Sequence, residues 1–213
     1  MRIKPEHPCN VVLVGRSKCG KSVVAKHLFR SWPGAKLVVD NTRDVASSLG
    51  RRGEDWVELE DLSGGWPGDA RTVVAWPDVS KPDGGLADAD AAIGIAVERG
   101  DCLVWLDEIG ATLPVGKTGP SARRLLNHGR HHDVSYLACG PRPVMIDSLV
   151  LSQAMHVVMF NVPNPKDRRR LAETTGIPPA VLDESMNRLE PYEFLWFDAG
   201  EYTLTHCPPL PLR

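Results

Sequence analysis

The chain has 213 residues, 42% of them hydrophobic and 24% charged, which suits one compact α/β domain and excludes a second large one. A formal net charge of -2 excludes a surface covered in basic charge, so any nucleic-acid contact has to come from a local patch or an oligomer. The 5 cysteines form no C-x-x-C pair, and no apolar run approaches the ~20 residues of a membrane span. We therefore expect a protein of the reducing cytoplasm with no membrane span.

Short apolar runs predict buried strands in the first part of the chain. Residues 10–14 are apolar on both faces, as in a parallel strand that helices cover on each side. Helical spacing over residues 22–30 predicts a helix that ends at Trp32-Pro33-Gly34, and residues 36–40 predict a second strand. Residues 51–85, rich in Gly, Pro, Asp and Trp, predict an irregular insert with one edge-like strand at 72–76.

Strands and helices alternate in the rest of the chain. Residues 86–99 predict an Ala-rich helix that Gly100 ends. Further strands are predicted at 102–107, 135–139 and 156–160, and further helices at 121–130, 146–153 and 166–175. Residues 193–197 and 201–205 flank Asp198-Ala199-Gly200 and predict a β-hairpin, which a Pro-rich extended tail follows.

A glycine-rich loop follows the first predicted strand. Residues 15–22 match the pattern G-x-x-x-x-G-K-[ST], in which Gly15 and Gly20 let backbone N–H groups face a phosphate at a helix N-terminus. Lys21 is expected to contact the β- and γ-phosphate oxygens, and Ser22 to bind Mg²⁺. The alternative, an ordinary glycine-rich turn, is disfavoured by the strand and helix on either side. The predicted nucleotide-binding residues are Gly15, Arg16, Ser17, Lys18, Cys19, Gly20, Lys21, Ser22 and Val23.

An acidic pair ends the strand predicted at 102–107. Asp107 is expected to bind Mg²⁺, and Glu108 to orient and deprotonate an attacking water, which favours hydrolysis. The alternative is a strand that ends in a solvated acidic turn. The sequence contains no Asn-Lys-x-Asp motif for reading guanine, so ATP is preferred to GTP.

The motifs and the order of elements predict an α/β fold of the P-loop NTPase (RecA/ASCE-like) type. A mainly parallel central sheet is flanked by helices and followed by a C-terminal β-hairpin. Residues 1–190 are expected to form the ATPase domain, with the irregular insert at 51–85, and residues 191–213 the hairpin and Pro-rich tail.

In its motifs and in the residues that end its predicted strands, the sequence resembles the HerA/FtsK superfamily of DNA-pumping ATPases. The small viral genome-packaging members of that superfamily are nearest to it in size. The resemblance rests on the phosphate loop, the strand ending at Asp40, the Asp107-Glu108 pair, and above all residues 129–143 and 152–160. It implies a motor that assembles as a homo-oligomeric ring, often a hexamer, around double-stranded DNA and moves it without reading its sequence. A viral procapsid vertex is a further candidate partner, in the host cytoplasm or the virion.

In such rings an arginine of one subunit stabilises the charge on its neighbour's γ-phosphate. By resemblance Arg130 is the first candidate, with Arg123 and Arg124 in reserve; the alternative is solvated helix charges or DNA contacts. The family's fourth strand ends in a polar sensor, typically Gln. Gly140 stands in this place, so either Cys139 or Arg142 replaces the sensor or the coupling differs.

Other charged and metal-ligating residues leave alternatives open. Lys166 with Arg168, Arg169 and Arg170, and Arg51 with Arg52, are candidate contacts to DNA phosphates, or else solvated charges. The histidines at 128, 131 and 132 lack the spacing of a metal site. Cys19 is more simply a tolerated loop residue than a reactive thiol.

Two other functions remain as alternatives to a DNA motor. One is a phage assembly or secretion ATPase that acts on a protein partner. The other is a small-molecule kinase, which the Asp107-Glu108 pair disfavours because it is suited to water as the acceptor.

Overall fold

The computed structural model describes residues 9–211, in which one nine-stranded sheet has the order β3-β4-β2-β5-β6-β1-β7-β8-β9. Strands β1 to β7 pair in parallel, whereas β7-β8 and β8-β9 pair antiparallel. The strands are β1 Asn10–Val14, β2 Ala35–Val39, β3 Val57–Glu58, β4 Thr72–Ala75, β5 Cys102–Leu106, β6 Val134–Gly140, β7 His156–Met159, β8 Phe194–Asp198 and β9 Thr203–Cys207. The predicted mainly parallel sheet with a C-terminal hairpin is confirmed.

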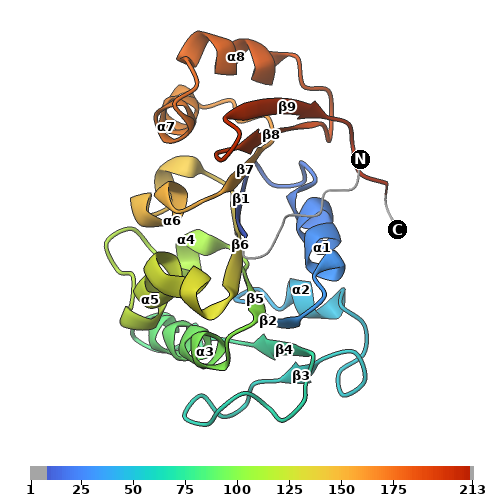
Figure 1. Ribbon diagram of the computed structural model, residues 1–213, viewed down its shortest axis with the longest axis vertical. Coiled ribbons are helices and arrows are strands. Elements are labelled where there is room, and N and C mark those ends of the chain that lie inside the picture. The colour runs from blue at the N-terminus through green and yellow to red at the C-terminus, as the bar shows by residue number, and fades with distance from the viewer. Residues whose placement is uncertain (1–8, 212–213) are drawn as a thin grey trace.

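Helices cover both faces of this sheet (Figure 1). The α-helices are α1 Lys21–Ser31, α2 Asp44–Ser47, α3 Leu86–Arg99, α4 Ile109–Thr112, α5 Pro120–His128, α6 Ser148–Ser152, α7 Pro165–Thr175 and α8 Pro179–Asn187, with 3-10 turns η1 Gly129–His132 and η2 Pro143–Met145. In Figure 1, α1 and α2 lie on one side of the sheet and α3 to α6 on the other, while α7 and α8 lie beside the hairpin.

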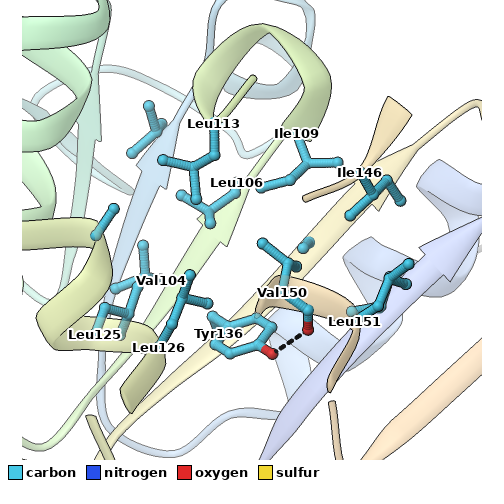
Figure 2. Close-up of a cluster of buried hydrophobic side chains, with 14 of the residues drawn as sticks. Val104, Leu106, Ile109, Leu113, Leu125, Leu126, Tyr136, Ile146, Val150 and Leu151 are labelled. Carbon is cyan, nitrogen blue, oxygen red and sulfur yellow. Dashed lines mark hydrogen bonds between the residues drawn. The ribbon is translucent and has the colours of Figure 1, made fainter. Parts of the chain in front are cut away.

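Alternate residues of each central strand pack into two separate cores. In β1, Val12 and Val14 face the larger core, whereas Val11 and Leu13 face the core beneath α1. Since both faces are covered, the parallel strands are apolar without interruption, which is why they were predictable. Figure 2 shows part of the larger core, where the buried Tyr136 hydroxyl donates a hydrogen bond of 2.8 Å to the Val150 carbonyl oxygen.

The structure differs from the predicted elements in two places. The strand expected at 72–76 is β4, which is not at the edge of the sheet because the two-residue β3 pairs with its outer side. Helix α8 was not expected. It begins at Pro179, and proline is compatible with the first turn of a helix, where an N–H has no intrahelical partner.

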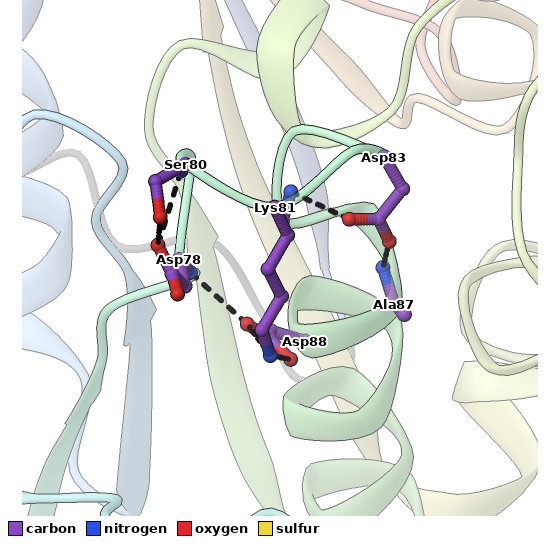
Figure 3. A network of polar contacts seen from close by, with 7 residues as sticks. Asp78, Ser80, Lys81, Asp83, Ala87 and Asp88 are labelled. Carbon is purple, nitrogen blue, oxygen red and sulfur yellow. Dashed lines mark hydrogen bonds and ion pairs between the residues drawn. The ribbon is translucent and has the colours of Figure 1, made fainter.

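The loop between β4 and α3 is fixed by a polar network (Figure 3). Lys81 Nζ donates to both carboxylate oxygens of Asp88 at 2.6 and 2.8 Å, and the Asp78 N–H donates to the same carboxylate at 3.0 Å. Asp83 accepts a bond of 2.8 Å from the Ala87 N–H in the first turn of α3. This part of the insert therefore has a defined conformation at the carboxyl edge of the sheet.

The ends of the chain limit two predictions. Residues 1–8 of the expected ATPase domain, and residues 212 and 213 of the Pro-rich tail, lie outside the described residues.

Candidate nucleotide-binding and hydrolysis site

The phosphate loop leaves the carboxyl end of β1 between the ends of β6 and β7. The Gly15 N–H donates to the Gly140 carbonyl at 3.3 Å, and the Phe160 N–H donates to the Val14 carbonyl at 2.9 Å. A Cβ on Gly15 would lie 2.6 Å from the Cβ of Phe160, so only glycine fits there. The loop is thus held at the carboxyl ends of the parallel strands, where open α/β sheets bind their ligands.

The first turn of α1 completes the loop. Gly20 adopts φ +109°, a left-handed conformation that favours glycine, and directs the chain into the helix. The first turn contains no acidic residue, and no side chain caps it, so the positive end of the helix dipole is uncompensated. This end of α1 is suited to bind an anion.

Lys21 lies against the loop that precedes it. Its Nζ donates hydrogen bonds to the carbonyl oxygens of Gly15 at 2.6 Å and Arg16 at 2.9 Å. Ser22 is exposed at the next position of the same turn. The ammonium group is therefore already positioned over the loop, where it can exchange these carbonyls for phosphate oxygens.

Asp107 follows β5, which β6 separates from β1 in the sheet. Burial, reinforced by the charges of Asp40 and Glu108, raises its pKa to about 6, and the nearby positive charge of Lys21 partly opposes this shift. Asp40 is fixed elsewhere, because its carboxylate accepts bonds from the N–H groups of Thr42 and Ala46 at the start of α2. Asp107 is thus the carboxylate that a cation would stabilise.

The two predicted Mg²⁺ ligands suit that ion. Hydroxyl and carboxylate oxygens are ligands that Mg²⁺ prefers, and Mg²⁺ keeps several waters, so it needs few protein ligands. Among residues 9–211 no group of three or more His, Cys, Asp or Glu side chains forms a metal site.

Glu108 lies beside Asp107 in an unusual backbone conformation. It is exposed and adopts φ +49°, which is uncommon for a residue other than glycine. Its carbonyl accepts a bond of 2.7 Å from the Ala111 N–H, so α4 holds this conformation. The structure therefore brings Glu108 to the same sheet edge as Asp107 and the phosphate loop.

Arg130 does not join this group. It is exposed in η1, before the first residue of β6, whereas the phosphate loop contacts Gly140 at the last residue of that strand. The seven residues of β6 separate these ends by roughly 20 Å. Arg130 cannot serve the nucleotide of its own subunit, and its role in a neighbour's site stays a prediction. The reserve candidates Arg123 and Arg124 are exposed on α5, the helix that leads to η1.

The position of the expected sensor is closed by packing. A Cβ on Gly140 would lie 2.9 Å from Cγ2 of Ile109 and 3.0 Å from Cδ1 of Ile146, so a larger residue would require these side chains to shift. Cys139 is buried, and burial raises the pKa of its thiol. Arg142 forms an ion pair with the buried carboxylate of Asp167 at 3.1 Å, so the structure anchors this candidate to α7.

Some of the candidate DNA contacts already form ion pairs within the protein, whereas others are exposed. Arg168 has a 15% exposed side chain that pairs with Asp183 at 3.1 Å, so it holds α7 to α8. In the insert, Arg51 and Arg52 form exposed ion pairs with glutamates. Lys166 and Arg169 are exposed on α7, and they are the members of that cluster best placed to meet a phosphate backbone.

Sequence reasoning missed one part of the site. A cavity of about 510 Å³ lies beside the phosphate loop and the first turn of α1. Tyr192, Pro209 and Leu210 from the C-terminal region complete its wall. No local pattern indicates this, because the segments are about 170 residues apart in the sequence. A second cavity of about 430 Å³ is also lined by Tyr192, together with residues 16–19 of the loop.

The thiol within the phosphate loop is not activated. Cys19 is half-buried, and burial raises its pKa despite the opposing charges of Lys21 and Arg16. This agrees with the simpler interpretation of Cys19 as a tolerated loop residue.

Solved structures share this fold over almost the whole chain. The genome-packaging NTPase B204 of Sulfolobus turreted icosahedral virus 2 in complex with ATPγS superposes with a TM-score of 0.73, at 22% identity, over 94% of this chain and 97% of that one. Its complex with sulfate gives a TM-score of 0.75, at 22% identity, over 95% and 97% of the two chains.

VirB4 of Thermoanaerobacter pseudethanolicus gives a TM-score of 0.65 at 10% identity, over 95% of this chain and 89% of that one. No protein-family model and no curated protein matches the sequence. Among the described residues, no helix is long and apolar enough to cross a bilayer. The predicted resemblance is confirmed in the fold: the chain has the P-loop ATPase architecture that it shares with a viral genome-packaging NTPase and with VirB4.

Proposed function

We propose that this protein is an ATP-hydrolysing motor that translocates double-stranded DNA, as a viral genome-packaging ATPase acting in a ring. The observation that carries the proposal is the meeting of the phosphate loop, Asp107 and Glu108 at one edge of a sheet. B204 is described as a genome-packaging NTPase and as a DNA-packaging ATPase, and this similarity supports DNA as the molecule that the motor moves. DNA translocation and ring assembly are carried to this chain from them and from the motif resemblance.

The residues divide the work of hydrolysis as follows. The N-terminus of α1 and Lys21 bind and orient the phosphates, and Ser22 and Asp107 would hold Mg²⁺, which neutralises developing charge on the phosphate oxygens. Glu108 orients a water in line with the γ-phosphate and accepts its proton. Arg130 of a neighbouring subunit would stabilise the charge on the transferred group.

Nucleotide complexes of the relative support ATP as the ligand. B204 has been solved with ATPγS, with AMPPCP and with AMP. Since AMP lacks the β- and γ-phosphates that a phosphate loop mainly binds, base and ribose contacts should also contribute to affinity in this chain.

Whether DNA is the substrate of the motor can be tested by measuring ATP hydrolysis with and without double-stranded DNA at low salt. We expect DNA to stimulate turnover several-fold, and the stimulation to fall steeply as salt is raised, because phosphate contacts release counterions. Single-stranded DNA at the same phosphate concentration is the control. An ATPase that DNA leaves unchanged but that a capsid or membrane-complex protein stimulates would instead favour the assembly or secretion function.

The role of Arg130 can be tested by mixing variants. Arg130→Ala subunits and Lys21→Ala subunits are each expected to be inactive alone, yet mixed rings should recover part of the ATPase activity. The reason is that an intact loop in one subunit then meets an intact arginine from its neighbour. The same mixture with Arg124→Ala in place of Arg130→Ala tests the reserve candidate. An equimolar mixture that stays inactive would contradict a role for Arg130 across the interface.

A further inference from the structure

The cavity beside α1 is built differently from the phosphate loop that it adjoins. Val23, Val24, Pro209 and Leu210 give it a mostly apolar wall, while Lys21 and Ser22 lie at its border with the loop. Its volume of about 510 Å³ is within the range of small-molecule sites, which are typically apolar with a few placed polar groups. Such a wall suits a flat apolar group that is attached to a phosphate chain.

Tyr192 forms the rim of this cavity in a strained conformation. It adopts φ +69° at the third position of the turn Glu190-Pro191-Tyr192-Glu193, where the Glu193 N–H donates to the Glu190 carbonyl at 3.1 Å. With proline at the second position, such a turn normally has glycine at the third. An aromatic residue at a glycine position costs stability, and strain of this kind is concentrated at functional sites.

The ring of Tyr192 is exposed yet close to the loop. Tyr192 is 59% exposed. A Cβ on Gly20 would lie 3.6 Å from Cδ1 of Tyr192, so the ring edge borders the last glycine of the phosphate loop. The aromatic face is therefore available to a ligand whose phosphates lie in the loop.

The turn and the tail are tied together. Glu193 accepts a hydrogen bond of 2.7 Å from Nε2 of His206 in β9, and β9 ends at the buried Cys207 just before the tail. Leu210 packs against the core beneath α1. The two walls of the cavity that come from the C-terminal region are therefore held in one position relative to α1.

We propose that Tyr192 and Leu210 form a clamp for the nucleotide base, with Tyr192 stacking on one face of the base and Leu210 packing against it. The clamp deepens the proposed function, because it rests on nucleotide binding at the loop. It makes the C-terminal tail part of the nucleotide site. Phosphates are bound by α1 and Lys21, and the base is bound by residues that lie about 170 positions later in the sequence.

The clamp can be tested by comparing a nucleotide with its phosphate chain alone. Calorimetric titration with Mg²⁺ and either AMPPNP or inorganic tripolyphosphate separates base contacts from phosphate contacts. We expect Tyr192→Ala to weaken AMPPNP binding about tenfold or more, the range for loss of one aromatic stacking partner, and to leave tripolyphosphate binding unchanged. Leu210→Ala should have the same selectivity with a smaller loss, and Tyr192→Phe should bind as the wild type does.

Two further variants guard against misfolding. Tyr192→Gly relieves the positive φ, so its melting temperature should not fall while AMPPNP affinity does. Tyr202→Ala changes another exposed tyrosine at positive φ, in the turn between β8 and β9 and outside the cavity, and should not affect nucleotide binding.

The outcomes separate the clamp from the function on which it rests. Wild-type affinity for AMPPNP in both Tyr192→Ala and Leu210→Ala would overturn the clamp alone. Parallel loss of AMPPNP and tripolyphosphate would also overturn it, because the substitution would then act on the phosphate loop. A wild-type protein that binds neither probe would overturn the proposed function together with the clamp.

Discussion

Glu108→Gln is expected to keep ATP binding while slowing hydrolysis by at least about 100-fold, the usual lower range for loss of a general base. Glutamine can still accept a hydrogen bond from the attacking water, but it cannot take the proton. The backbone at φ +49° is fixed by α4 and is unaffected by the exchange of a carboxylate for an amide. Single-turnover hydrolysis and equilibrium binding of ATP measure the two effects separately.

Two controls give this result its meaning. Lys21→Ala should lose both binding and hydrolysis, because it removes contacts to the phosphates in the ground state as well as the transition state. Glu98→Gln, an exposed glutamate on α3, should behave as the wild type. Normal turnover in Glu108→Gln would show that another group activates the water.

Asp107→Asn is expected to abolish Mg²⁺-dependent hydrolysis and yet stabilise the metal-free protein at pH 7.5. The pKa of Asp107 in the folded state is about 6, against 3.8 as its ordinary value, mainly because of burial. The folded protein therefore binds more protons than the unfolded chain between these values, and stability falls as the pH rises through this window. Well above pH 6 the wild type carries the whole penalty, on the order of 3 kcal/mol, which asparagine avoids.

The pH dependence distinguishes this effect from a general change in packing. Urea unfolding in EDTA should show the gain in Asp107→Asn at pH 7.5 and little gain at about pH 3, where Asp107 is mostly protonated in both the folded and the unfolded state. Asp69→Asn, at an exposed position before β4, should show no gain at either pH. A gain that is equal at both pH values, or destabilisation at pH 7.5, would contradict the assigned cause.

Features encoded within a few neighbouring residues were predictable. The strands at 10–14 and 102–107 are continuous apolar runs, since a parallel strand covered on both faces has no polar side. Helix α3 was predicted with its observed limits, because its Ala-rich run ends at Gly100. Helix α8 was not predicted, although the apolar spacing of Leu182 and Met186 was an available signal.

Several properties of the site depend on partners that are distant in sequence. Arg168 belongs to an Arg-rich run, but its ion pair with Asp183 depends on how α7 meets α8. A Cβ at Gly140 would meet Ile109 and Ile146, which approach this position from two other segments. Neither fact has a signal in the local pattern, because side-chain contacts between elements are set by their packing.

The sequence by itself determined that the chain has a phosphate loop on a buried strand and an acidic pair at the end of another, since each motif is a local arrangement of the backbone. Only the tertiary structure decided that β6 lies between those strands. It also placed Arg130 at the amino ends of the parallel strands, opposite the carboxyl ends where the phosphate loop lies. It also brought Tyr192 and the C-terminal tail to the phosphate loop. The physical reason is that strand order and the return of the tail come from long-range packing, which no short stretch of residues encodes.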